Sequence, residues 1–283
     1  MLVSGTNLHP PAYEGRNYKL WCGDSAKILK TFPDNCVHLI VTSPPYYIRS
    51  GLYTDLDDDI ENAPTYDEYI SKLLEILREC HRVLVPGGRM CVNIADSWTN
   101  LAREKVNMCY PTHAHIIVEM INTGMEYKGS IIYKQIRVHH ASGGALKLLG
   151  SFPYPPNLPL LNLFEYILIF KKKGEYTKKH VPPHIREASK ITKEELVWLA
   201  TGVWQIPPNR QRKPCPAPFP IEIPRRLIKL FSFVGDIVLD PFMGQGTCVE
   251  VAVQLGRVGW GIDINPEYVA YTAERVSSIL PLY

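Results

Sequence analysis

The sequence predicts an α/β fold, in which helices cover both faces of a mostly parallel, twisted sheet. Two short runs that are rich in branched apolar residues, Val37–Val41 and Ile237–Asp240, are typical of strands that are buried on both faces. Segments with apolar residues at helical spacing separate such runs, which indicates alternating strands and helices. A chain of 283 residues with 46% hydrophobic residues can bury a full core, so we expect one domain over residues 1–283.

The composition excludes several classes of protein. The net charge is only +3, so any contact with nucleic acid must come from local clusters of basic residues. Seven cysteines occur without a C-x-x-C pair, which argues against a zinc site or a disulfide framework and favours a reducing cytoplasm. We expect no bound metal. The chain start lacks a signal-peptide pattern and no apolar stretch approaches about 18 residues, so we expect neither secretion nor membrane spanning.

The first half of the chain predicts one βαβ unit followed by two pairs of helix and strand. Strand 18–22 ends at Gly23-Asp24-Ser25, and a carboxylate at the end of such a strand lies where open α/β sheets bind ligands. Asp24 is therefore either a cofactor contact or the N-cap of the next helix. The acidic run 55–61 is typical of a solvated loop. The expected elements are helix 26–32, strand 37–41, a helix that begins at the capping box Thr65-x-x-Glu68 and is ended by Pro86-Gly87-Gly88, strand 89–94, helix 113–123 and strand 129–136.

Two segments in the second half have little apolar periodicity. Residues 137–163 are too long for an idle connection in a compact domain. Residues 171–190 contain seven Lys or Arg against two Glu, a balance of +5, which indicates either a surface for the phosphate backbone or a solvated lysine face. We expect 137–163 and 171–213 to be insertions for target recognition, with the lysines of 171–173 on the side of Tyr46. The elements expected around them are strand 165–170, a helix from Thr192 to Ala200, helix 223–233, strand 237–240, helix 248–255, strand 258–262 and a last helix to about residue 278.

The turn Thr42–Tyr47 ends the Val37–Val41 strand and has a pattern that indicates function. A Pro-Pro pair fixes two φ angles and has no N–H to donate, so its carbonyls are acceptors beside the Ser43 hydroxyl. Tyr46 adds a flat π-face next to these acceptors. Acceptors beside a ring suit a planar group with an NH₂, such as the edge of a nucleobase. The alternative is a structural turn with a packing tyrosine.

A glycine loop and an acidic strand end predict a nucleoside site near the end of the chain. The loop Pro241–Thr247 contains Gly244 and Gly246, and glycine there lets a ligand approach the backbone at a helix N-terminus. Asp263, at the end of the next strand, can accept hydrogen bonds from ribose hydroxyls. The loop lacks the third glycine of a dinucleotide fingerprint and the Lys-Ser/Thr pair of a P-loop. We therefore expect a nucleoside cofactor without pyrophosphate, a description that S-adenosyl-L-methionine meets.

These motifs resemble those of the amino-methylating, S-adenosylmethionine-dependent DNA methyltransferases of the permuted (beta) order. In that family a Ser/Asp-Pro-Pro-Tyr turn precedes a Phe-x-Gly-x-Gly loop, as Ser43–Tyr46 precedes Phe242–Gly246 here. The resemblance covers about residues 18–135 and 164–278, and it implies a circularly permuted, Rossmann-like methyltransferase fold. Serine at position 43 resembles the cytosine-N4 branch, whereas aspartate is usual for adenine N6. Cys215 stands where relatives often carry histidine, and we assign it no role.

The motifs and the resemblance assign three groups of residues. The implied catalytic residues are Ser43, Pro44, Pro45 and Tyr46, with the target base flipped out of the duplex and stacked on the tyrosine. Cofactor contacts are expected from Asp24, Thr42, Asp240, Pro241, Phe242, Gly244, Gly246, Thr247, Asp263 and Ile264. Substrate contacts are expected from Tyr47, Arg137, His139, His140, Lys171, Lys172, Arg210 and Arg212.

The sequence leaves alternatives open. The implied reaction is methylation of cytosine N4 in double-stranded DNA, and its nearest rivals are adenine N6 in DNA and cytidine N4 in ribosomal RNA. A noncatalytic nucleic-acid-binding module is disfavoured because Asp24, Gly244, Gly246 and Asp263 are all present. The incomplete glycine pattern disfavours a nicotinamide-dependent oxidoreductase, and the lack of a partner acid for Cys215 disfavours a C5-cytosine mechanism. A homodimer and a cognate restriction endonuclease are both compatible with the sequence.

Overall fold

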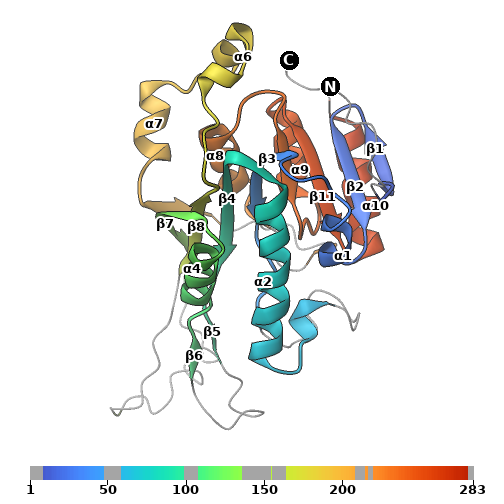
Figure 1. The fold of residues 1–283 in the computed structure, drawn as a ribbon, viewed down its shortest axis with the longest axis vertical. Helices are drawn as coiled ribbons and strands as arrows, with labels where there is room; N and C mark the ends of the chain where they lie inside the picture. Colours follow the sequence, from blue (N-terminus) through green and yellow to red (C-terminus); the bar gives the residue numbers. More distant parts are fainter. Residues whose placement is uncertain are drawn as a thin grey trace.

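The computed structural model describes residues 9–47, 59–98, 108–135, 154, 164–207, 214–215 and 219–279. Within these residues nine strands form one twisted sheet with helices on both faces (Figure 1). A separate two-stranded sheet pairs β5 (Ser97–Trp98) with β6 (Cys109–Tyr110). The strands of the large sheet are, in their order across it, β1 (Tyr13–Gly15), β2 (Tyr18–Cys22), β11 (Val258–Asp263), β10 (Ile237–Asp240), β3 (Val37–Thr42), β4 (Leu84–Ile94), β8 (Phe164–Lys171), β7 (Glu126–Gln135) and β9 (Val203–Ile206).

The direction of the strands defines two edges of this sheet. The neighbours β2, β11, β10, β3 and β4 all run parallel, so their carboxyl ends lie along one edge, which we call the carboxyl edge. It faces down in Figure 1, toward β5 and β6. Strand β8 is antiparallel to β4, so β8 begins at the carboxyl edge and ends at the opposite edge, where Lys171 pairs with Arg89.

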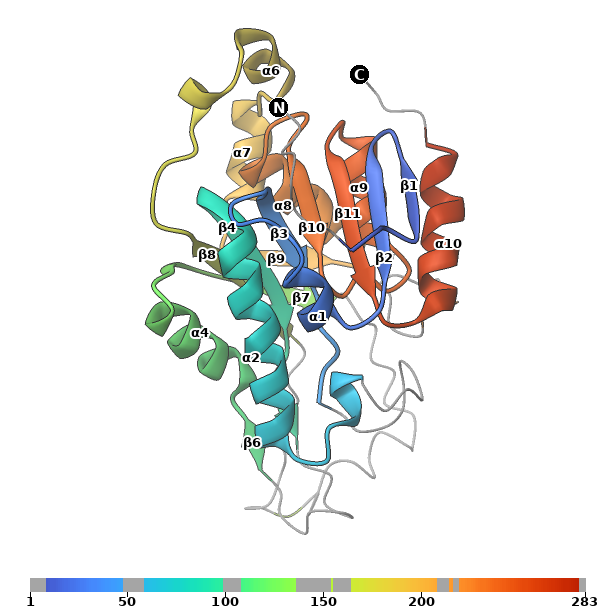
Figure 2. The ribbon, with the colours of Figure 1, turned by 45° about the vertical axis from the view of Figure 1, so that its right-hand side comes forward.

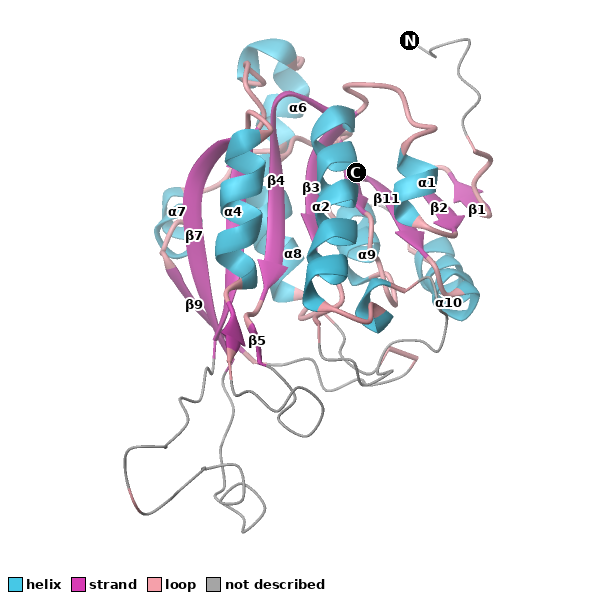
Figure 3. Ribbon diagram, turned by 60° about the horizontal axis from the view of Figure 1, so that its bottom comes forward, coloured by secondary structure: helices cyan, strands magenta, loops and turns pink. Residues whose placement is uncertain are grey.

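Helices cover the two faces of the sheet in separate groups (Figures 2 and 3). One face carries α1 (Ser25–Leu29), α2 (Tyr66–Val83) and α4 (Thr112–Asn122), with the 3₁₀ turn η1 (Ile60–Asn62) before α2. The other face carries α8 (Glu222–Phe231), α9 (Thr247–Gln254) and α10 (Pro266–Ser277). The chain from β8 to β9 forms the 3₁₀ turn η2 (Lys178–His180), α6 (Pro183–Ala188) and α7 (Lys193–Leu199). None of the described helices combines the length and hydrophobicity needed to cross a membrane.

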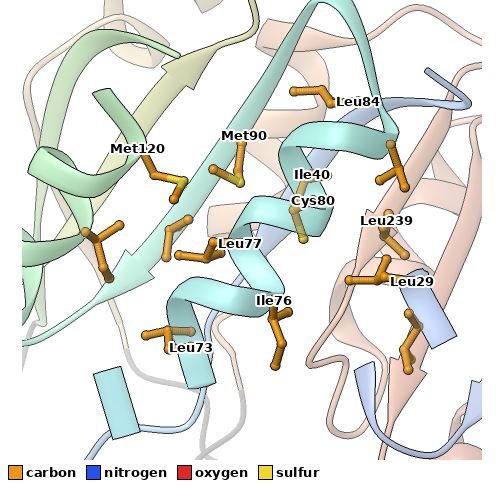
Figure 4. Packing of buried hydrophobic residues seen from close by; sticks show 14 of the residues in the cluster. Leu29, Ile40, Leu73, Ile76, Leu77, Cys80, Leu84, Met90, Met120 and Leu239 are labelled. Carbon is orange, nitrogen blue, oxygen red and sulfur yellow. The ribbon is translucent and has the colours of Figure 1, made fainter. Parts of the chain in front are cut away.

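Helix α2 shows how the apolar spacing of the sequence becomes a packed core. Thr65 caps the helix by accepting a hydrogen bond from the Glu68 backbone N–H at 3.2 Å, as its position in the capping box predicts. One face of the helix presents Leu73, Leu77 and Cys80, all fully buried, to the sheet (Figure 4). Burying each leucine contributes about 1.5–3 kcal/mol, so this face holds α2 against β3 and β4.

The predicted elements are found with shifts of a few residues, and two differences have clear causes. The strand that was expected to begin at Arg89 begins at Leu84, because Leu84 already pairs with Val37 and because Gly87 and Gly88 exchange backbone hydrogen bonds with Lys172. Strand β7 begins three residues earlier than expected. Strands β1, β5, β6 and β9 and helix α6 were not predicted, since short elements take their conformation from partners elsewhere in the chain.

Strand β2 lies beside β11 and pairs with it in parallel, with Cys22 opposite Asp263. This pairing brings the loop after β2 next to the loop after β11. Asp24 and Asp263, which are far apart in the sequence, therefore lie at the same edge of the sheet.

Candidate active site

One pocket opens at the carboxyl edge, between the loops that follow the parallel strands. It brings together most of the catalytic and cofactor residues that the sequence predicted: Asp24, Ser43, Pro45, Asp240, Pro241, Phe242, Gly244, Asp263 and Ile264. It also contains residues that the sequence did not predict: Ser25, Asp59, Ile60, Ile76, Cys215, Phe219, Gln245 and Tyr268.

The turn after β3 is held in place by a donor from α2. Ser43 and Pro45 line the pocket, while Pro44 is buried. The Tyr69 hydroxyl donates to the Pro45 carbonyl at 2.9 Å, which ties this part of the turn to α2. Among the described residues none donates to the Pro44 carbonyl. Of these groups the Ser43 hydroxyl is an acceptor at the pocket wall, whereas Pro44 lies outside the pocket lining.

Tyr46 is anchored through its hydroxyl, by residues that sequence analysis missed. The hydroxyl donates to Glu165 Oε2 at 2.7 Å, and the side-chain amide of Asn93 donates to the same hydroxyl at 3.0 Å. Asn93 comes from the end of β4 and Glu165 from the start of β8. No local pattern marks either residue, because their link to Tyr46 exists only where β3, β4 and β8 meet.

Asp240 stabilises the start of the glycine loop. Its Oδ1 accepts hydrogen bonds from the Thr42 hydroxyl at 2.7 Å and from the Phe242 backbone N–H at 3.0 Å. Desolvation outweighs these two bonds and raises the pKa of Asp240 to about 7. Thr42 itself does not reach the pocket lining; it contacts the site through Asp240.

Asp263 shapes the glycine loop from the other side. Its two carboxylate oxygens accept backbone hydrogen bonds from Gly244 at 2.8 Å and from Asn265 at 2.9 Å. Desolvation raises the pKa of Asp263 to about 7 despite these bonds. Each carboxylate oxygen keeps a second lone pair, so Asp263 can still accept from a ligand in the pocket.

The two glycines of the loop have different roles. Gly244 has φ +51°, and a Cβ there would find only Cys215 Sγ, 3.7 Å away, so its missing side chain leaves room at the pocket wall. Gly246 has φ +78°, and a Cβ there would lie 2.2–2.8 Å from the Thr272 side chain. Gly246 and the buried Thr247 are outside the pocket lining, and the missing side chain of Gly246 allows the close approach of α10.

Asp24 is the N-cap of α1 and also lines the pocket. Its Oδ1 accepts from the Ala26 backbone N–H at 2.8 Å, which is the capping bond that the sequence allowed. Next to it, the Ser25 hydroxyl donates to the Pro241 carbonyl at 2.5 Å and ties the loop after β2 to the glycine loop.

The acidic run 55–61 is not wholly a solvated loop. Asp59 and Glu61 are 5% and 0% exposed, which corrects that expectation for the described end of the run. Asp59 caps η1 by accepting from the Glu61 N–H at 3.0 Å, and burial raises the pKa of Asp59 to about 6. In the sequence the only local sign of this structure is Asp59 itself, because aspartate is favoured at the N-cap position before a helical turn.

The expected substrate residues are mostly not at this pocket. Tyr47 is 4% exposed and packs against the rings of Tyr66, Tyr69 and Tyr110, so the structure places it in the core and outside the pocket lining. Lys171 and Lys172 lie at the opposite edge, because β8 runs antiparallel to β4, and the expectation that they share the side of Tyr46 is wrong. The other five, Arg137, His139, His140, Arg210 and Arg212, lie outside the described residues.

The chemistry of the pocket fits S-adenosyl-L-methionine. Its walls carry Asp24, Asp59, Asp240 and Asp263, and none of the described residues that line it is Lys, Arg or His. The sulfonium and ammonium groups of the cofactor outweigh its one carboxylate, so this cofactor brings the positive charge that the walls lack. Phe219, Phe242 and Tyr268 supply apolar surface for a nucleoside. When bound, the cofactor supplies an electrophilic methyl group.

Comparisons with known proteins identify the family. The profile of a family described as DNA methylase matches residues 37–274. The type II methyltransferase M.MjaI of Methanocaldococcus jannaschii is 34% identical over 288 residues, which cover 92% of this chain and 91% of M.MjaI.

Solved structures give the same result. The protein TTHA0409 of Thermus thermophilus, solved in complex with S-adenosyl-L-methionine, is 32% identical with a TM-score of 0.73, covering 94% of this chain and 96% of that one. The cytosine-N4-specific PvuII DNA methyltransferase is 19% identical with a TM-score of 0.69, covering 98% of this chain and 92% of its own, and shows the shared fold. The chain therefore belongs to the N6/N4 family of DNA methylases and is an S-adenosyl-L-methionine-dependent DNA methyltransferase.

Proposed function

We propose that this enzyme methylates the exocyclic N4 of a cytosine within a specific site in double-stranded DNA. The observation that carries the proposal is that Ser43 and Pro45 line the same pocket as Gly244 and Asp263. A base whose amino group reaches Ser43 therefore comes directly next to the bound methyl donor. Serine at position 43 supports cytosine as the target, because it resembles the turn of the cytosine-N4 branch, whereas aspartate is usual for adenine N6.

The turn residues hold the amino group for attack. Ser43 Oγ and the Pro44 carbonyl accept the two amino hydrogens, which draws the nitrogen lone pair out of conjugation with the ring. Tyr46 stacks on the base after it is flipped out of the duplex. The amino nitrogen takes up the methyl group as the S–C bond breaks with its electron pair on sulfur, and the nitrogen releases one proton. Orientation by the turn supplies most of the rate.

Asp263 and Gly244 are our proposed contacts to the cofactor, with Asp263 accepting from its ribose hydroxyls. For the DNA we retain the contacts expected from the sequence outside the described residues: Arg137, His139, His140, Arg210 and Arg212. We propose residues 137–163 as the segment that contacts the bases of the recognition site.

One experiment tests the reaction and the substrate together. The enzyme is incubated with methyl-labelled S-adenosyl-L-methionine and either unmethylated plasmid DNA or ribosomal RNA, and the nucleosides are identified by mass spectrometry. We expect label in N4-methylcytosine from DNA. N6-methyladenine would overturn the choice of base, and N4-methylcytidine from the RNA would overturn the choice of nucleic acid. A Tyr46→Ala preparation is the matched control for methylation by contaminating enzymes.

A further inference from the structure

The turn at Ser43–Tyr46 is connected to one carboxylate by a network of four side chains. Glu165 Oε2 accepts from the Tyr46 hydroxyl at 2.7 Å and from Asn93 Nδ2 at 2.6 Å. The same Asn93 nitrogen lies 3.0 Å from the Tyr46 hydroxyl and 3.4 Å from Ser43 Oγ. The network thus joins both side chains to which the proposed function gives a role in the reaction.

We propose that Glu165, with Asn93, positions Tyr46 and Ser43 for methyl transfer, a role that rests on the proposed function of the turn. Neither residue lines the pocket, and each acts through the turn. Glu165 is therefore a positioning residue, supplied by a strand that follows Tyr46 by 119 residues.

The direction of each hydrogen bond explains how the network orients the turn. An ionised carboxylate only accepts, so the Tyr46 hydroxyl must donate to Glu165, and the phenol ring is held at its far end. The amide nitrogen of Asn93 only donates, and it shares its two hydrogens among Glu165 Oε2, the Tyr46 hydroxyl and Ser43 Oγ. Ser43 Oγ is therefore an acceptor in this network and keeps one lone pair for the amino group of a target base. One face of Tyr46 and one lone pair of Ser43 are thus presented in a single arrangement.

The burial of Asn93 makes the network rigid. Asn93 is 2% exposed, and its position opposite Ile167 is set by the pairing of β4 with β8. A buried amide that lost its acceptors would be left with unsatisfied hydrogens, so the arrangement resists rotation of either ring or carboxylate.

A double-mutant cycle tests this role. Single-turnover incorporation of labelled methyl into unmethylated plasmid DNA is measured for wild type, Glu165→Ala, Tyr46→Phe and the double variant, and cofactor affinity is measured by calorimetry. We expect each single change to lower the single-turnover rate about tenfold or more, since each removes a hydrogen bond to a charged group. We expect the double variant to be no slower than the slower single variant, with cofactor affinity and the KM for DNA within about twofold of wild type.

Two further variants separate positioning from folding and from charge. Glu165→Gln keeps an acceptor for Tyr46 but removes the charge. We expect its rate to lie between those of wild type and Glu165→Ala. If Glu165→Ala does not fold, the Glu165→Gln variant takes its place in the test. Glu14→Gln removes a carboxylate from an exposed ion pair with Lys19 and is the matched control, expected at the wild-type rate.

The outcomes distinguish this proposal from the proposed function. Full-rate transfer by Glu165→Ala, or additive losses in the double variant, would overturn the role of Glu165. Total methyl incorporation is independent of the base, so a wild-type enzyme that methylates adenine would overturn the cytosine assignment and leave this cycle interpretable.

Discussion

The two edges of the sheet differ in the sign of their charged side chains and in how far these side chains are buried. At the carboxyl edge, Asp59, Asp240 and Asp263 line one pocket whose described walls hold no cation. At the opposite edge, Lys172 Nζ donates to Asn35 Oδ1 at 2.9 Å and to the Arg82 carbonyl at 3.0 Å, beside other lysines that are exposed. The buried carboxylates of the pocket have no cation beside them among the described lining residues, so a cationic ligand can supply the opposite charge. The lysines of the opposite edge are solvated or already hydrogen-bonded, so they need no further partner. Among the described residues, the proposed active site therefore lies where charge is withdrawn from water, although lysines cluster at the other edge.

The largest effect is expected from Asp263→Ala, which removes the carboxylate that shapes the glycine loop. The change leaves the Gly244 and Asn265 N–H groups without their acceptor and removes the proposed contact to ribose. We expect the free energy of S-adenosyl-L-methionine binding to weaken by about 1.5–3 kcal/mol, as for hydrogen bonds to charged groups. Calorimetry measures this directly, and equal affinity in the variant would remove Asp263 from the site.

Tyr46→Ala tests whether the base is held at the carboxyl edge. Stacking of a base on an aromatic ring is worth about 1–3 kcal/mol, so this variant should lose most methyl transfer while binding the cofactor normally. The measurement is single-turnover methyl transfer to plasmid DNA. If Tyr46→Ala methylates as fast as wild type, the turn is structural and the comparison between the edges loses its functional meaning.

Substitution of the two glycines of the loop separates stability from binding. Gly246→Ala places a Cβ against Thr272 at a positive φ, so we expect a loss of about 1–2 kcal/mol in the free energy of unfolding. Gly244→Ala has room for its Cβ and should lose less stability, but Gly244→Val should weaken cofactor binding by filling the pocket wall. Chemical denaturation measures the stability of each variant, and calorimetry measures its affinity for the cofactor. Equal stability of both alanine variants would contradict the packing role of Gly246.

Cofactor binding should strengthen as the pH rises from 6 to 8. In the free enzyme the pKa of Asp59 is about 6 and those of Asp240 and Asp263 are about 7, so these groups are partly protonated near pH 6. A cationic ligand prefers their ionised forms, so binding releases protons. Affinity should rise about tenfold over this range for each group with a pKa of 7 that is coupled to the ligand.

The same pKa values predict the opposite trend for the stability of the free enzyme. These aspartates ionise at a pKa of about 3.9 when unfolded, so the folded state binds more protons between about pH 4 and pH 7. Their contribution to the free energy of unfolding therefore falls as the pH rises through this window.

Calorimetry tests the binding prediction. Titrations of the enzyme with the cofactor, in buffers of different ionisation heat, count the protons that are released on binding. Asp263→Asn is the control expected to release fewer, and a pH-independent affinity would contradict the coupling.

The smallest effect is expected at the opposite edge. Neutralising the exposed Lys173, Lys178 and Lys179 to glutamine should leave the salt dependence of DNA binding unchanged, since these residues lie away from Tyr46. Removing one lysine that binds a phosphate of duplex DNA would reduce the slope by about 0.9. A slope reduced by about two or more would place DNA at this edge too. Arg210→Gln with Arg212→Gln is the comparison, because the sequence predicts that these two do bind phosphate.

Local patterns predicted much of this molecule because their causes are local. Two prolines fix the turn after β3 whatever surrounds it, and the Thr192 and Glu195 side chains exchange hydrogen bonds with each other's backbone N–H groups at the start of α7 as their spacing requires. The strands, the glycine loop and Asp263 could be placed for the same reason.

Tertiary structure alone decided which side chains meet. Glu165 reaches Tyr46 only because β8 runs antiparallel beside β4, and the same strand direction carries Lys171 to the opposite edge. A strand has the same alternation of side chains in either direction, so its own residues do not reveal its orientation. In the sequence Asp59 is likewise one acid in a charged run, and only the folded structure shows that it lines the pocket. Residue type and spacing therefore determined what chemistry the chain can perform, and the pairing of distant strands determined which residues perform it.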